Sequence, residues 1–244
     1  MWSDVVDLRD FYDSSLGQMA RRMIRRQIRT VWPDTRGLRI LGLGYATPYL
    51  RSFRDDTERV LAIMPASQGV LPWPPEGPGL VGLAEETDLP LADRSIDRVV
   101  VVHAMESTEH ARGMMREIWR VLADSGRLLI VTPNRRGIWA HFEKTPFGQG
   151  RPYTTIQLNK LLRDNMFMPL QTATALHMPP IASRTLLKVA PAIEQLGNRW
   201  FGGVAGVLLV EAAKQLYAGT AVRGEAEPKR AYVALPTGLR RLRG

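Results

Sequence analysis

Over the first 135 residues, short apolar runs alternate with stretches of helical periodicity. Continuous apolar runs of four to seven residues between turn signals are typical of strands buried on both faces of a sheet. Buried strands are predicted at 38–43, 59–64, 80–83, 96–102 and 127–131. An amphipathic helix is predicted at 108–122, between the last two of these strands. Because strands joined through helices of this length require right-handed crossovers, the pattern predicts an α/β fold with a parallel sheet.

An amphipathic helix is also predicted before the first strand, at residues 11–31, ending at Trp32-Pro33. Apolar residues recur along one face of this helix, and five arginines fill the other. The arginines are Arg21, Arg22, Arg25, Arg26 and Arg29. A basic amphipathic helix can lie on a membrane surface, but packing against the edge of the domain with a solvated basic face is the favoured interpretation.

The second half of the chain has weaker patterns. Residues 133–153 show little periodicity, and a loop of this length in a compact domain is usually functional or disordered. Thr154 and Gln157 have the spacing of a capping box, which predicts a helix to about residue 164. A further helix is predicted at 182–196 and a late strand at 204–210. The expected organisation is an N-terminal helical segment (1–35), an α/β domain (36–218, with a substrate-side region at 133–200) and a basic flexible tail (219–244).

The stretch between the first strand and the next helix carries the clearest turn signal. Gly44 allows the chain to turn sharply with a positive φ. Thr47 followed by Pro48 predicts a helix over about 47–54, with Thr47 as its N-cap. Since open α/β sheets bind ligands beyond the carboxyl ends of their strands, this turn is the predicted ligand site.

The composition excludes several classes of protein. Apolar residues make up 45% of the chain and charged residues 23%, which excludes a disordered chain. The absence of cysteine excludes disulfides, thiolate metal sites and a cysteine nucleophile, and with only four histidines no metal site is expected. The N-terminus lacks the order of a signal peptide, and the longest apolar run is too short to span a membrane, so a cytoplasmic protein is expected.

The formal net charge of +9 leaves two interpretations open. A basic surface can attract nucleic acid, anionic lipid or acidic substrates. A bias toward arginine codons also explains the charge, and it is favoured because the arginines are scattered along the chain and few lie beside aromatic residues.

Four segments between residues 89 and 134 match a known family pattern. They are Leu89-Pro-Leu-Ala-Asp-Arg-Ser-Ile-Asp97, Val99 to His103 with Glu106, Arg116-Glu-Ile-Trp-Arg-Val-Leu122 and Ser125-Gly-Arg-Leu-Leu-Ile-Val-Thr-Pro-Asn134. With the opening strand, this text resembles the class I S-adenosylmethionine (SAM)-dependent methyltransferases of the small-molecule, methyltransferase type 11-like group. The resemblance covers roughly residues 10–135. It implies a Rossmann-like fold, with a mostly parallel seven-stranded sheet and helices on both faces.

The resemblance implies that SAM binds at the first turn, although two acidic positions of the family pattern are lost. The residues aligned with cofactor contacts are Gly42, Gly44, Tyr45, Ala46, Met64, Glu85, Glu86 and His103. Gly42 stands where the family has an acid that pairs with the SAM ammonium group, and Met64 where it has the acid that holds the ribose. Glu85 keeps the acid that faces the adenine, with Glu86 as its neighbour. SAM binding is therefore expected through a modified site.

The loop 133–153 supplies most of the candidate catalytic and substrate-binding residues. His141 is the favoured candidate base, His103 at the end of the central strand is its rival, and Tyr153 is a third candidate catalytic group. Asn134, Arg151 and Tyr153 are the candidate substrate contacts, with Arg151 as an anion anchor. The alternative is that aromatic residues of this loop only plug the edge of the sheet. Those residues are Trp139, Phe142, Phe147 and Tyr153.

Three functions remain open from the sequence. The first is a SAM-dependent methyltransferase acting on a small molecule or a protein side chain. The second is a catalytically inactive methyltransferase-like protein that binds a protein partner or serves as a scaffold, which the losses at Gly42 and Met64 favour. The third is a nucleic-acid methyltransferase, suggested by the charge but disfavoured because His103-Ala-Met-Glu106 replaces a base-methylation motif. Fold alone does not separate them.

Overall fold

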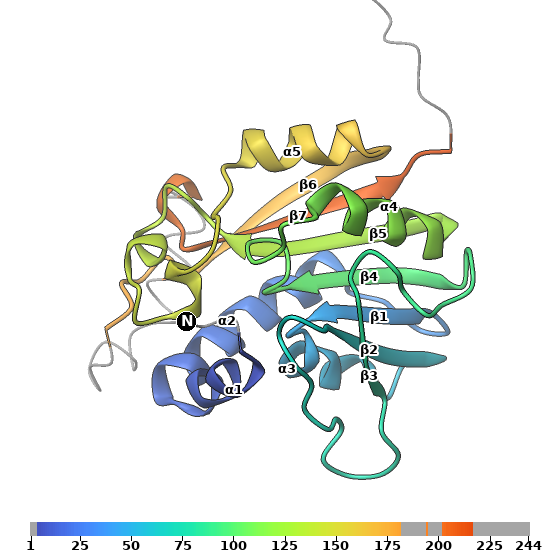
Figure 1. Ribbon diagram of the computed structural model, residues 1–244. Helices are drawn as coiled ribbons and strands as arrows, with labels where there is room; N and C mark the ends of the chain where they lie inside the picture. Colours follow the sequence, from blue (N-terminus) through green and yellow to red (C-terminus); the bar gives the residue numbers. More distant parts are fainter. Residues whose placement is uncertain (1–3, 182–193, 195–201, 217–244) are drawn as a thin grey trace, which may run out of the picture.

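A single seven-stranded sheet forms the centre of the molecule (Figure 1). The computed structural model describes residues 4–181, 194 and 202–216. The strands are β1 (Arg39–Gly44), β2 (Arg59–Pro65), β3 (Val81–Ala84), β4 (Ile96–Val102), β5 (Leu122–Pro133), β6 (Phe167–Ala175) and β7 (Val207–Lys214). Their order is β3-β2-β1-β4-β5-β7-β6; the first five are parallel, and β7 runs antiparallel to β5 and β6. The predicted mostly parallel, Rossmann-like sheet is confirmed, with β4 at its middle and β1 beside it.

Helices cover both faces of the sheet (Figure 1). The α-helices are α1 (Val5–Asp13), α2 (Ser15–Val31), α3 (Thr47–Leu50), α4 (Ala111–Val121) and α5 (Thr155–Asp164), and the short 3-10 helices are η1 (Arg51–Phe53), η2 (Ile138–His141), η3 (Pro146–Gly148) and η4 (Gly202–Val204). Side chains of α1, α2 and α3 share one hydrophobic cluster with one sheet face, and those of α4 and α5 share a second cluster with the other. Along β4, Val100 faces the first cluster and Val101 the second, as a continuous apolar strand predicts.

The predicted single helix at 11–31 is wrong, because two helices meet at Ser14. The Ser14 hydroxyl accepts a hydrogen bond from the N–H of Gly17 at 3.0 Å and so caps α2. Gly17 then packs directly against the end of α1, where an added Cβ would lie 1.9 Å from the carbonyl oxygen of Phe11. This break sends α1 across the carboxyl edge of the sheet, where it contributes to the candidate site.

The turn after β1 is confirmed, but its predicted cap is wrong. Gly44 has a φ of +81°, which favours glycine. Helix α3 begins at Thr47 itself, and its N-cap is Ala46, which provides no side-chain hydrogen bond. Pro48 lies in the first turn, as expected. The helical stretch at 47–53 is therefore divided into α3 and η1.

Other differences lie in the second half of the chain. The capping box is confirmed at the start of α5, where the Thr154 and Gln157 side chains both make their bonds. Strand β6 has no predicted counterpart because it is an edge strand, it contains Pro169, and most of its residues are not buried. The late strand begins at Val207 rather than residue 204. The helix predicted at 182–196 lies almost entirely outside the described residues, and the tail at 219–244 lies wholly outside them.

Within the described part of the chain, no helix has the length and apolar character needed to cross a bilayer.

The partly buried ion pair between Arg39 and Asp97 gives a test of the sheet. Asp97 accepts hydrogen bonds from the backbone N–H of Arg39 at 2.9 Å and from its guanidinium at 2.9 and 3.0 Å, which joins the starts of β1 and β4. These bonds hold the pKa of Asp97 below its usual value. A lowered pKa stabilises the fold above the unfolded pKa of about 3.9, and this stabilisation is lost as the pH falls through the folded value.

We therefore expect Asp97→Asn to lower the free energy of unfolding by about 1–2 kcal/mol at pH 7, after allowing for solvent screening. In urea titrations the difference from the wild type should shrink below about pH 4 and vanish below both pKa values. Asp10→Asn, at the exposed Arg9–Asp10 pair, is the control and should leave the unfolding midpoint unchanged. A deficit in Asp97→Asn that persists unchanged at low pH would show that the ion pair is not its cause.

Candidate functional site

The candidate site lies at the carboxyl ends of β1 and β4, which are paired strands. Gly44, the last residue of β1, is paired in register with Val102, the last residue of β4. A Cβ on Gly44 would lie 2.2 Å from the carbonyl oxygen of Val102. This close approach requires glycine and places the turn after β1 directly beside His103.

His103 follows β4 in a left-handed conformation, with a φ of +54°. For a residue other than glycine this conformation is strained, and it persists only where the surroundings hold it. The His103 ring is buried, with its Nε2 2.7 Å from Tyr12 Oη and its Nδ1 3.0 Å from Glu106 Oε1. Both ring nitrogens are therefore bound by side chains at the sheet edge.

The partners of His103 determine the direction of these hydrogen bonds. Because a carboxylate can only accept, we assign the proton on Nδ1 to the bond with Glu106, which leaves Nε2 to accept from Tyr12. Tyr12 Oη can then accept from Tyr49 Oη at 2.8 Å. Burial raises the pKa of Tyr12 well above its usual value, so this hydroxyl remains a donor at neutral pH.

Glu106 is itself held by the strands and loops around it. Its Oε2 lies 3.4 Å from Thr132 Oγ1, and its backbone oxygen accepts the N–H of Arg151 at 2.8 Å. A Cβ on Gly150 would lie 2.4 Å from that same backbone oxygen, so the loop packs closely here. The sequence interpretation missed both Glu106 and Tyr12 as site residues. The spacing of three residues between His103 and Glu106 was the available signal, whereas nothing local pointed to Tyr12.

Aromatic rings cover this hydrogen-bonded chain. The Phe147 ring centroid lies 5.1 Å from that of His103, and Trp139 packs edge-on against Phe147 at 5.4 Å. The Tyr45 ring is stacked on Tyr12 at 5.7 Å, and burial raises the pKa of Tyr45 to about 12. Trp139 and Phe147 are thus packing residues at the sheet edge, while Phe142 is exposed.

The turn fits SAM at some positions and not at others. A carboxylate at Gly42 would have no space, because a Cβ there would lie 2.6 Å from Leu50 Cδ1 and 2.8 Å from Ala46 Cβ. Met64, at the ribose position, is buried in the core. At the adenine position, Glu85 is exposed, and the buried Glu86 accepts a hydrogen bond from Thr108 Oγ1 at 2.9 Å. At the positions that the family pattern assigns, an acidic residue is thus present for the adenine of SAM but not for its ribose or its methionine end.

The other predicted residues lie around this centre. His141 ends η2 and is exposed, as is Arg151, and Tyr153 is half-buried. Asn134 is buried, and its side chain donates to the carbonyl of Ala205 at 2.8 Å and accepts from the N–H of Arg136 at 3.1 Å. The Asn134 side chain is thus used to hold its own loop. Among the described residues, no group of acidic residues and histidines has the arrangement of a metal site.

A family model described as a methyltransferase domain matches residues 41–130. This stretch runs from β1 through most of β5 and includes Gly42, His103 and Glu106. No curated protein matches the chain.

Solved structures share the fold at low sequence identity. A SAM-dependent methyltransferase of Thermotoga maritima is 16% identical, with a TM-score of 0.61, and the match covers 88% of this chain and all of that one. The Haloferax volcanii complex of a methyltransferase with the Trm112 methyltransferase activator matches at 16% identity and a TM-score of 0.56, covering 86% and 98% of the two chains. The [4+2]-cyclase SpnF matches at 20% identity and a TM-score of 0.53, covering 79% and 81%.

We expect Tyr12→Phe to destabilise the fold, because it leaves two buried partners, Tyr49 Oη and His103 Nε2, without their shared hydroxyl. The expected loss is about 1–3 kcal/mol in the free energy of unfolding. Tyr45→Phe is the matched control, since the Tyr45 hydroxyl has no hydrogen bond within the described residues and its ring stacks on Tyr12. Equal unfolding midpoints for the two variants would contradict the assigned network.

Proposed function

We propose that this chain is a class I SAM-dependent methyltransferase that transfers a methyl group from SAM to a small molecule or a protein side chain. The proposal rests chiefly on the juxtaposition of the Gly44 turn with the His103–Glu106 pair at one edge of the sheet. A cofactor at the turn would then lie next to a group able to accept a proton.

SAM would be held mainly at its adenine. Glu86 or Glu85 would accept from the adenine amino group, and the tight turn at Gly44 lets the backbone approach the cofactor closely. Backbone and apolar contacts would have to supply the rest, because Gly42 and Met64 provide no carboxylate. When bound, SAM supplies an electrophilic methyl group on a sulfonium.

In this proposal His103 is the base and Glu106 its positioning partner. The acceptor oxygen of Glu106 keeps the proton on Nδ1, so Nε2 is the atom that can take a proton from a hydroxyl or amine. In the structure, the Tyr12 hydroxyl occupies Nε2 by a hydrogen bond. An acceptor must therefore displace the Tyr12 hydroxyl or pass its proton through it.

A second function is favoured by a different observation. The lack of space at Gly42 and the rings of Tyr12 and Tyr45 over the turn favour a methyltransferase-like protein without catalysis that binds a protein partner. A match to a cyclase at 20% identity illustrates that this fold also supports functions other than methyl transfer.

Calorimetric titration with S-adenosylhomocysteine, the demethylated product of SAM, separates the two functions. We expect saturable binding with a dissociation constant below about 1 mM, weakened by Glu86→Gln or Glu85→Gln if that residue faces the adenine. Glu109→Gln, at an exposed acid outside the turn, is the control. If neither the wild type nor Tyr12→Ala, which removes the covering ring, binds the product, the non-catalytic function replaces the first.

The two candidate bases can be separated with radiolabelled SAM and a panel of hydroxyl- and amine-bearing acceptors. We expect His103→Ala to lower methyl transfer by about 100-fold or more while product affinity is kept, because a positioned base contributes at least about that factor. Glu106→Gln should have a smaller effect, and His141→Ala, at an exposed histidine, should leave transfer unchanged. If only His141→Ala loses methyl transfer, His141 in η2 is the base and His103 is not.

A further inference from the structure

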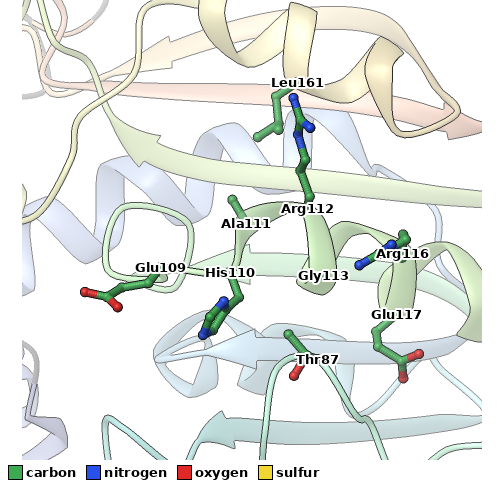
Figure 2. Close-up of a pocket in the computed structure, with 9 residues that line it drawn as sticks. All are labelled: Thr87, Glu109, His110, Ala111, Arg112, Gly113, Arg116, Glu117 and Leu161. Atoms are coloured by element: carbon green, nitrogen blue, oxygen red, sulfur yellow. The ribbon is translucent and has the colours of Figure 1, made fainter.

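A hollow with several arginines in its walls lies between α4 and α5, away from the turn after β1. Two adjoining hollows, of about 680 and 690 Å³, share Arg112 and Leu161 in their walls. We call them together the α4–α5 groove, lined chiefly by Arg112, Arg116, Arg135, Arg151, Tyr153 and Leu161. Figure 2 shows Arg112 reaching from the first turn of α4 toward Leu161 of α5. Each hollow has the size of a small-molecule site.

We propose that this groove binds the anionic group, a phosphate or a carboxylate, of the small molecule that the enzyme methylates. The inference rests on the proposed function and adds the chemical class of the acceptor. It comes from the arginines of the groove and from the contact of the groove with Glu106.

Within the described residues, the arginines of the groove form no ion pair, although Glu109, Glu117 and Asp164 also line its walls. Arg112, Arg116, Arg135 and Arg151 are exposed, and none makes an ion pair or a side-chain hydrogen bond with another described residue. Elsewhere on the fold several arginines are paired, as Arg39 is with Asp97 and Arg120 with Glu117. A guanidinium left unpaired in a hollow can bind a phosphate or carboxylate through two parallel hydrogen bonds.

The start of α4 adds to this positive potential. His110 is the N-cap of the helix and gives it no side-chain hydrogen bond. The N–H groups of the first turn, at Ala111 to Gly113, border the groove on the same side as Arg112. Gly113 allows the helix to pack close to the neighbouring loop, because a Cβ there would lie 2.6 Å from Thr87 Cγ2. An anion beside Arg112 would also be stabilised by these donors.

One wall of the groove is formed by the loop that contacts the backbone of Glu106. Its lining includes Gly150 and Arg151, which pack against the backbone oxygen of Glu106, the residue that positions His103. Tyr153 lines it too, and its pKa is raised by burial and by the nearby Glu106 charge. An anionic group held at Arg112 and Arg151 would therefore leave the rest of a small acceptor beside the loop that carries the site.

The same walls argue for a small anion rather than a nucleic acid. Glu109, Glu117 and Asp164 also line the two hollows, so a phosphate backbone following the groove would meet carboxylates. Tyr153 is the only aromatic side chain of the phenyl or indole type in this lining, whereas nucleic-acid grooves use several stacking rings. One phosphate or carboxylate group needs only the two or three nearest arginines.

Amide NMR titration of the full chain tests the groove with inorganic phosphate in one arm and succinate in the other, at constant ionic strength. We expect saturable shifts at Ala111 to Gly113 and at Gly150, Arg151 and Tyr153, and the arm that saturates at lower concentration identifies the anion. The double variant Arg112→Gln, Arg151→Gln should bind at least about tenfold more weakly. The matched control Arg22→Gln, Arg26→Gln removes the same charge from exposed positions of α2 and should bind as the wild type does.

Three outcomes would overturn the inference: no saturation in either arm, equal binding by both double variants, or a single-stranded RNA oligonucleotide that binds the groove more tightly than either anion. Titration of the Arg112→Gln, Arg151→Gln variant with S-adenosylhomocysteine separates this inference from the proposed function. We expect that affinity to match the wild type. If the protein binds the anion but not S-adenosylhomocysteine, the groove is an anion site and the proposed methyltransferase function is rejected. If it binds S-adenosylhomocysteine but not the anion, only the inference about the groove is rejected.

Discussion

The hydrogen bonds on the two nitrogens of His103 are the constraint on which this edge of the molecule depends. Through Tyr12 they connect β4 to α1 and α3, and through Glu106 they connect it to β5 and the loop that follows. The left-handed backbone at His103 is compatible with the fold because these partners hold the ring on both sides. A cofactor or acceptor that enters the site must therefore compete with contacts that also organise the helices above the sheet.

Glu211 and Lys214, two buried charged residues at the opposite, antiparallel side of the sheet, are held by structural contacts. Glu211 on β7 accepts from the indole of Trp32 at 2.9 Å, from Gln171 at 2.7 Å and from Arg127 at 3.2 Å, which ties α2 and β6 to the sheet. The Lys214 ammonium donates a hydrogen bond to the carbonyl of Leu122 and lies over the ring of Trp119. The contrast with the unpaired arginines between α4 and α5 is informative, because buried charges need partners whereas surface charges in a hollow are available to a ligand.

Strand and turn positions could be predicted from the sequence where local chemistry determines them. Four strands begin within one residue of their predicted starts and the capping box of α5 was correct, because apolar runs and capping side chains act within a few residues. The break at Ser14, the edge strand β6 and the role of Tyr12 depend on contacts between distant segments. The sequence named His103 but gave no means of seeing that α1 returns to cover it.

Gly42 constrains how this chain can change over evolutionary time. Its neighbours Leu50 and Ala46 fill the space that a side chain would need, so a single substitution to aspartate would add an acid and a steric clash together. An aspartate here would require both Leu50 and Ala46 to move, and a smaller residue in place of Leu50 would itself leave a cavity in the core. Each of these single steps is therefore unfavourable, so Gly42 and the residues around it constrain one another.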